Sequence, residues 1–196
     1  MTTYSRRSYH HGNLRAALVR AAGDILDQSG AATLTLREAA RRAGVSHSAP
    51  YRHFADREAL LAEVVAQGFM QLAATLREAA SAGGAEVARA YLRFALGHPS
   101  RYRLMYAGEI SPARRADLAQ HFAPVLRVLT DSIPGLGDAE HARRAGTASW
   151  ALLHGLAGLL LGGYLGRPAP DAADAERVVR EVVGMIRFAA KPAAAA

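Results

Sequence analysis

The chain has 196 residues, of which 51% are hydrophobic, so it can bury a sizeable core and is not expected to be disordered. It contains no cysteine, which excludes a disulfide scaffold, a thiol nucleophile and any cysteine-based metal or iron–sulfur site. The net charge is +7, and residues 1–57 carry nine arginines against four acidic residues, an excess that suits a polyanionic partner and equally a merely solvated basic surface.

The apolar residues recur at helical spacing, and no segment alternates apolar and polar residues as a strand does, so the sequence predicts an all-α fold. The N-terminus lacks the apolar region of a signal peptide. Residues 145–165 form the longest apolar run, and the charge before it and the amphipathic segments around it favour a buried core or interface helix over a membrane span. We therefore expect a cytoplasmic protein with no membrane partner.

A first helix carries its apolar stripe over residues 14–26 and is expected to end at Gly30. Thr35 is a suitable N-cap for a second helix over residues 36–43, and a glutamate three residues later completes a capping-box pattern. Gly44 follows as a residue that can adopt a positive φ and end this helix.

Ser46 is the next N-cap candidate, and it predicts a very short third helix that ends near His53. Pro50 falls within the first turn of that helix, where its missing N–H is expected to remove little. Asp56 is a further N-cap, and the amphipathic stripe behind it predicts a long connecting helix over residues 57–79.

The stretch over residues 80–85 is rich in small residues and predicts a break between an N-terminal head and a larger C-terminal body. We assign residues 1–57 to an arm and the head, residues 80–190 to the body and residues 191–196 to a frayed tail. Further helices are expected near residues 86–97, 100–107, 112–131, 139–165 and 172–190. The expected architecture is three helices in the head and about six in the body.

The most informative segment is residues 35–54, in which two helices are joined at Gly44 by a turn too tight for them to run antiparallel. The two helices must therefore cross, and Val45 can pack them together. The second helix then exposes hydrogen-bonding side chains along one side, with small residues where it would approach a major groove closely. This arrangement is typical of a DNA-binding helix-turn-helix.

Residues 13–65 resemble the DNA-binding head of the TetR family of transcriptional regulators, and the match continues through the Asp-Arg-Glu-Ala-Leu-Leu run at residues 56–61. The resemblance implies a dimer whose recognition helices enter successive major grooves of a palindromic operator in double-stranded DNA. By position it implies that the phosphate contacts are Thr35, Tyr51, His53 and Arg57, that the residues nearest the bases are Arg37, His47, Ser48 and Ala49, and that Ser46 and Arg52 lie beside them.

Some of these residues also fit a purely structural role. Tyr51 fits a core aromatic as well as a phosphate contact, although its polar neighbours favour the contact. His53 fits local packing and phosphate binding equally, whereas Phe54 is expected in the core. The basic arm over residues 6–11 is a further candidate for minor-groove or backbone contacts.

Trp150 and His154 lie four residues apart and share a helix face, and Gly155 follows. This helix resembles the C-terminal domain of a TetR subgroup named for its Trp, His and Gly residues. The resemblance implies a ligand-sensing body, with helices near 139–165 and 172–190 forming a homodimer interface. The candidate lining of an effector pocket is mostly aromatic and consists of Tyr91, Phe94, Tyr102, Met105, Tyr106, Phe122, Trp150 and His154. The same residues also fit a solid core, with His154 as a satisfied core histidine.

The sequence contains none of the motifs of hydrolases, metalloproteases or nucleotide-binding enzymes, so we expect no enzymatic activity, no catalytic or metal site and no cofactor. On the family resemblance, the expected function is a repressor that a small apolar or amphiphilic effector releases from DNA. The alternative is a DNA-binding architectural or adaptor protein without small-molecule input. A pocket of roughly a few hundred Å³ between the body helices would favour the first function over the second.

Overall fold

The computed structural model describes residues 11–106, 108–165, 177 and 180–181, and all regular structure in these ranges is helical. The α-helices are α1 (His11–Ser29), α2 (Leu36–Arg42), α3 (Arg57–Ala80), α4 (Gly84–Gly97), α5 (Pro99–Tyr106), α6 (Pro112–Asp131) and α7 (Ala139–Leu161). Two 3₁₀ turns, η1 (Ala31–Thr33) and η2 (Pro50–Arg52), precede and follow α2. The predicted all-α class is confirmed. The helix expected over residues 172–190 and the basic arm over residues 6–11 lie almost wholly outside the described residues.

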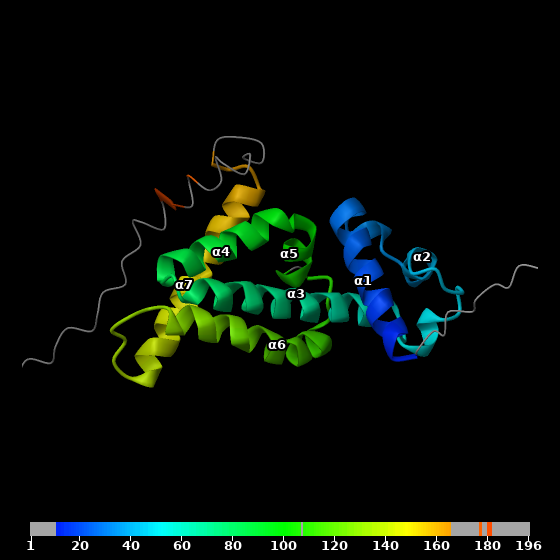
Figure 1. Ribbon diagram of the computed structural model, residues 1–196, viewed down its shortest axis with the longest axis horizontal. Coiled ribbons are helices and arrows are strands. Elements are labelled where there is room, and N and C mark those ends of the chain that lie inside the picture. Colours follow the sequence, from blue (N-terminus) through cyan, green and yellow to red (C-terminus); the bar gives the residue numbers. More distant parts are fainter. Residues whose placement is uncertain (1–10, 107, 166–176, 178–179, 182–196) are drawn as a thin grey trace, which may run out of the picture.

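Helix α3 forms the axis of the molecule (Figure 1). Helices α4 and α6 run along opposite sides of α3. Helix α7 packs against both of them, near the end of α3 that lies away from the head. The head, made of α1, α2 and the two 3₁₀ turns, lies at the other end, where α3 begins. The body therefore wraps around α3, and α3 connects it to the head.

The helix boundaries in the head follow the capping residues. Thr35 Oγ1 accepts from the Glu38 N–H at 3.0 Å, and Asp56 Oδ1 accepts from the Ala59 N–H at 2.6 Å, which confirms both N-caps. Gly44 has a φ of 70°, as expected of a helix-ending glycine. The capping box is only half formed, because the Glu38 carboxylate turns to Arg41 and accepts from its Nε at 2.8 Å.

The predicted helix from Ser46 to His53 is wrong: the segment forms consecutive tight turns and only the short η2. In an α-helix capped by Ser46, the first intrahelical bond would run from the N–H of residue 50 to the Ser46 carbonyl. Pro50 has no N–H to donate, so the Ala49 N–H takes that carbonyl instead, at 3.0 Å. In such a helix, residues 47–49 would not need their N–H groups, but residue 50 would, so a proline at position 50 prevents the α-helix.

One continuous apolar core runs from the head into the body. In the head it contains Leu18, Leu26 and Leu34, and in the body it contains Leu72 and Leu153, all at most 2% exposed. Helix α3 is long and apolar enough to cross a membrane by length and composition alone, but 56% of its apolar window is buried inside the fold, as in the core helix of a globular protein. Helix α3 thus belongs to both the head and the body. The turn into α4 covers residues 81–83, within the break predicted over residues 80–85.

Candidate DNA-binding head and effector pocket

The backbone makes the sharp turn that follows α2. The Val45 N–H donates to the Ala40 carbonyl at 3.0 Å, and the Gly44 N–H donates to the Arg41 carbonyl at 3.2 Å. These bonds satisfy carbonyls that the helix end would leave open, and the positive φ of Gly44 allows the chain to reverse. The residues after the turn are thereby presented on the surface of the head, as a helix-turn-helix requires.

The predicted DNA-binding residues lie between the N-cap of α2 and the first residue of α3, and most of them are exposed. The exposed ones are Thr35, Arg37, Ser46, His47, Ser48, Tyr51 and Arg52, and the half-buried ones are Ala49, His53 and Arg57. Tyr51 is 62% exposed, which excludes the core-aromatic alternative, whereas Phe54 is buried as predicted. The individual contacts with bases and phosphates stay predictions.

Arg57 is set apart from the other candidates by its partners. Its Nε donates to the Leu34 carbonyl at 2.7 Å, its Nη2 donates to the Ala31 carbonyl at 2.6 Å, and Glu109 lies 3.6 Å away. These bonds tie the chain before α2 to the start of α3. They give Arg57 a positioning role that the sequence does not reveal, and a phosphate contact by Arg57 would compete with them.

Side chains also join the start of α3 to the start of α6. The carboxylate of Asp56, besides capping α3, accepts from Arg114 Nη2 at 2.9 Å. The Ser111 N–H donates to Glu58 Oε1 at 2.7 Å, and hydrogen bonding by Ser111 lowers the pKa of Glu58. The chain segment just after η2 is therefore fixed to the helix that forms one wall of the body.

A second tie joins α1 to the body through Arg101 of α5. Arg101 Nη2 donates to Asp27 at 2.8 Å and Nη1 donates to Gln71 at 2.6 Å, so one guanidinium bridges α1 and α3. A Cβ at Gly23 would lie 2.7 Å from the same guanidinium, so the absence of a side chain at Gly23 allows Arg101 to pack this closely against α1. The head is thus held to the body on two sides.

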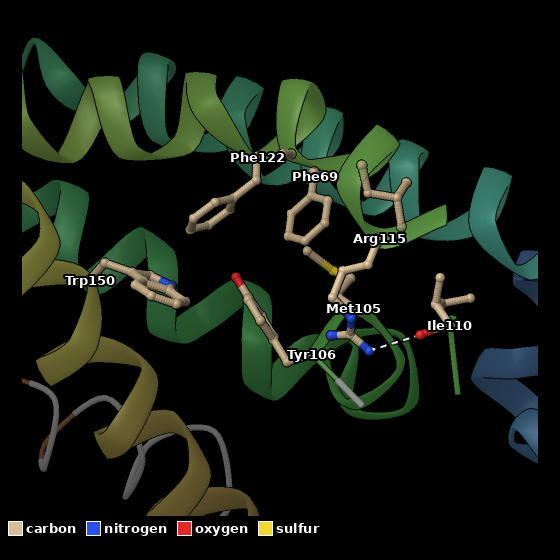
Figure 2. Close-up of a pocket in the computed structure, with 9 residues that line it drawn as sticks. Phe69, Met105, Tyr106, Ile110, Arg115, Phe122 and Trp150 are labelled. Carbon is tan, nitrogen blue, oxygen red and sulfur yellow. Dashed lines mark hydrogen bonds between the residues drawn. The ribbon is translucent and has the colours of Figure 1, made fainter. Parts of the chain in front are cut away.

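The body contains a pocket of about 240 Å³ between α3, α5, α6 and α7, which we call the aromatic pocket. It is lined by Phe69, Met105, Tyr106, Ile110, Arg115, Leu118, Ala119, Phe122 and Trp150. In Figure 2, Trp150 lies at one end, Ile110 and the guanidinium of Arg115 lie toward the other, and Tyr106 stands between them. Among these lining residues Arg115 carries the only charge.

The structure places the eight predicted pocket residues in three different settings. Four of them line the aromatic pocket: Met105, Tyr106, Phe122 and Trp150. Tyr102 and His154 line a neighbouring hollow of about 280 Å³ between α5 and α7, to which Tyr106 also contributes. Tyr91 and Phe94 line neither of the two, because Tyr91 is fully buried and Phe94 packs on His98 with ring centroids 5.3 Å apart.

Five lining residues could not be predicted from the sequence, because periodicity alone does not show which face of α3, or which part of the segment around the start of α6, meets α5 and α7. The missed residues are Phe69, Ile110, Arg115, Leu118 and Ala119. Phe69 belongs to the apolar stripe of α3, so it could be predicted to be buried but not to border a pocket.

A chain of hydrogen bonds supports the aromatic wall. The hydroxyl of Tyr91 lies 3.0 Å from that of Tyr102 and 3.3 Å from that of Tyr106, and the Tyr102 hydroxyl lies 2.7 Å from His154 Nδ1. Burial raises the pKa of all three tyrosines and lowers the pKa of His154, so each group is neutral near pH 7. His154 is therefore satisfied, as the core-histidine alternative predicts, and it also borders the hollow.

No group of three or more His, Asp or Glu side chains in the described part of the chain could hold a metal ion. The described side chains form two candidate binding surfaces, one on the head and one in the body. The head presents exposed hydrogen-bonding and basic groups, and the body presents an apolar pocket with one cation.

Two family models match the chain. Residues 18–64 match a model described as bacterial regulatory proteins of the tetR family, and residues 85–186 match a tetracyclin repressor-like C-terminal domain. Among solved structures, a protein of unknown function from Rhodococcus sp. RHA1 is 32% identical, with a TM-score of 0.74 over 91% of this chain and 96% of that one.

Two further structures show the same fold at lower identity. A TetR transcriptional regulator from Rhodococcus sp. RHA1 is 19% identical, with a TM-score of 0.63 over 90% of this chain and 97% of that one. A TetR family transcription regulator from Marinobacter aquaeolei VT8 is 18% identical, with a TM-score of 0.57 over 89% and 93%. The comparison with curated proteins gave no match. From its helix-turn-helix head and its matched C-terminal domain, the chain belongs to the TetR family of DNA-binding transcriptional regulators.

Proposed function

We propose that this regulator is a dimeric repressor that binds a palindromic operator and is released by a small apolar or amphiphilic effector. The observation that carries the proposal is the aromatic pocket, together with the tie between its wall α6 and the start of α3. An apolar pocket in a regulator whose head is built for DNA is what a ligand-responsive switch needs. The expected location is the cytoplasm, where the operator would be.

On the DNA side, the exposed residues divide by their place on the head. Arg37, His47 and Ser48 are proposed to read base edges, with Ala49 allowing close approach. Thr35, Tyr51 and His53 are proposed to contact phosphates, and Ser46 and Arg52 to lie at the margin. Arg57 is proposed to hold the head in shape, because its guanidinium already serves two carbonyls.

The proposed dimer face is the exposed side of α7. Leu152 and Leu159 are 42% and 45% exposed, which is unusual for large apolar residues on a long helix. Gly155 lies between them on the same side, and a Cβ there would meet nothing within 4 Å. A second copy related by two-fold symmetry would cover this face. Residues 172–190, the other predicted part of the interface, lie almost wholly outside the described residues.

The proposed switch runs through α6. An effector in the aromatic pocket would displace the start of α6, which carries Arg114, and Arg114 is bonded to the N-cap of α3. A shift of the start of α3 would move the adjoining η2 segment and change the spacing of the two heads. An effector that prefers the DNA-incompetent state about 100-fold would contribute about 2.7 kcal/mol to release.

The alternative, an architectural or adaptor protein without small-molecule input, predicts a solid core where the aromatic pocket lies. A pocket of about 240 Å³ that brings a cation beside five aromatic or sulfur-containing side chains favours the ligand-responsive function.

The test is selection of bound duplexes from a random pool with the full-length protein. A palindromic consensus with half-sites about one helical turn apart is expected, because the two heads of a symmetric dimer enter successive major grooves. Arg37→Ala should weaken binding to that consensus more than binding to random duplexes. Recovery of no consensus, or of one without two-fold symmetry, would contradict the dimeric regulator.

A further inference from the structure

The aromatic pocket has two chemically different ends. Trp150 and Phe122 lie at one end with ring centroids 4.9 Å apart, and they offer flat apolar surfaces. Arg115 reaches from α6 toward the other end, where its Nη2 donates to the Ile110 carbonyl at 3.1 Å (Figure 2). The pocket is therefore suited to a molecule that is itself apolar at one end and polar at the other.

The sign of the charge at the polar end is fixed. A guanidinium stays protonated throughout the ordinary pH range. None of the residues that line the pocket is acidic, so the lining itself supplies no negative charge. Arg115 also lies in the first turn of α6 (Pro112–Asp131), where the partial charge of the helix end has the same positive sign.

The size of the pocket limits the apolar end. An apolar cavity of about 150 Å³ is enough to hold benzene. A pocket of about 240 Å³ therefore has room for one aromatic ring and a short acid-bearing chain. The T-shaped and tilted arrangement of Phe69, Tyr106, Phe122 and Trp150 offers both ring faces and ring edges to such a molecule.

We infer that the effector is a small aromatic or arylalkyl carboxylate, with its ring near Trp150 and Phe122 and its carboxylate paired with Arg115. The inference rests on the proposed function only in calling this ligand the effector. The charge decides the ligand class, because a carboxylate that enters an apolar pocket without a cation loses its hydration and gains nothing in return.

The assay uses the one tryptophan of the chain, Trp150, which itself lines the pocket. Titration of the full-length protein with 3-phenylpropionate and, separately, with 3-phenylpropanamide gives two dissociation constants from the change in Trp150 fluorescence. The two probes share their ring and chain, and they differ in charge. Hydrogen bonds to charged groups are stronger than neutral ones, and Arg115 is exposed, so solvent reduces the gain. The acid is therefore expected to bind about threefold to tenfold more tightly than the amide.

Three variants separate the charge of Arg115 from its packing. Arg115→Met keeps the apolar stem and removes the charge, so its preference should reverse in favour of the amide. Arg115→Lys should keep the preference for the acid even if the methionine variant folds poorly. Arg127→Met is the matched control, because Arg127 is exposed on the same helix as Arg115 but does not line the pocket, and this variant should behave as the original protein does.

Equal or tighter binding of the amide to the original protein would overturn the inference, as would a preference for the acid that persists in Arg115→Met. Failure of both probes to bind at millimolar concentration would also overturn it. The proposed function fails separately: if the acid binds selectively but leaves the affinity for the selected operator unchanged, the carboxylate site stands and the repressor switch does not.

Discussion

Replacing Arg57 with alanine separates a residue that shapes the head from a residue that contacts DNA. The guanidinium donates to the carbonyls of Ala31 and Leu34 at 2.6 and 2.7 Å. Its side chain is 41% exposed, so each bond is discounted for solvent to about 1 kcal/mol, or about 2 kcal/mol for both. For a chain of this size, that loss lowers Tm by about 4–8 °C.

The same variant gives a second readout in DNA binding. A dimer that neutralises about eight phosphates shows a slope of log K against log salt of about −7. If Arg57 only positions the head, Arg57→Ala weakens binding to operator and random duplexes alike and leaves this slope unchanged. If Arg57 contacts one phosphate in each protomer, the slope flattens to about −5.

The measurements are a thermal melt and salt titrations on both duplexes, with Arg37→Ala as the control. Arg37 is exposed on α2, so its loss should leave Tm unchanged and should cost the operator more than random DNA. An unchanged Tm for Arg57→Ala together with a slope near −5 would refute the positioning role and restore the assignment made from the sequence.

Three further predictions concern the body. Gly146→Ala should cost about 1–3 kcal/mol in a melt, because a Cβ would lie 1.9 Å from Thr130 Oγ1 and 3.3 Å from its Cα, while Gly97→Ala, with nothing within 4 Å, should not destabilise. Leu152→Glu with Leu159→Glu should dissociate the dimer in light scattering, whereas Met70→Glu, on an equally exposed apolar residue of α3, should leave it intact. Burial lowers the pKa of His154 below its unfolded value near 6.5, so its contribution to stability is complete above that pH and is lost as the pH falls below it. The fall in Tm between about pH 7.5 and pH 5.5 should therefore be smaller in His154→Gln, and an equal fall in both proteins would exclude this contribution.

Most helix boundaries could be predicted because local chemistry determines them. Thr35, Gly44 and Asp56 each act on backbone groups within a few residues, and each does in the structure what its residue type predicts. The segment after Ser46 could have been predicted better, since the position of Pro50 already forbids the first bond of an α-helix capped there.

The pocket and the ties between head and body could be predicted only in part. Trp150 and Tyr106 could be identified from the sequence as candidate pocket residues. Whether such aromatic residues line a pocket or fill a core depends on how helices far apart in the sequence pack. Arg115 faces the pocket while its neighbour Arg114 reaches the cap of α3, and no sequence pattern distinguishes two consecutive arginines. Arg57 shows the same limit, because its partners lie 23 and 26 residues away.

Coupling between the head and the aromatic pocket is tested most directly by measuring how bound DNA changes the affinity of the pocket for a small compound. A compound that changes Trp150 fluorescence is titrated into the full-length protein with saturating operator duplex and, in parallel, with a scrambled duplex of equal length. The operator should weaken binding of the compound by the same factor by which the compound weakens operator binding, because the coupling free energy is reciprocal. Equal affinity for the compound with both duplexes would contradict a ligand-responsive regulator.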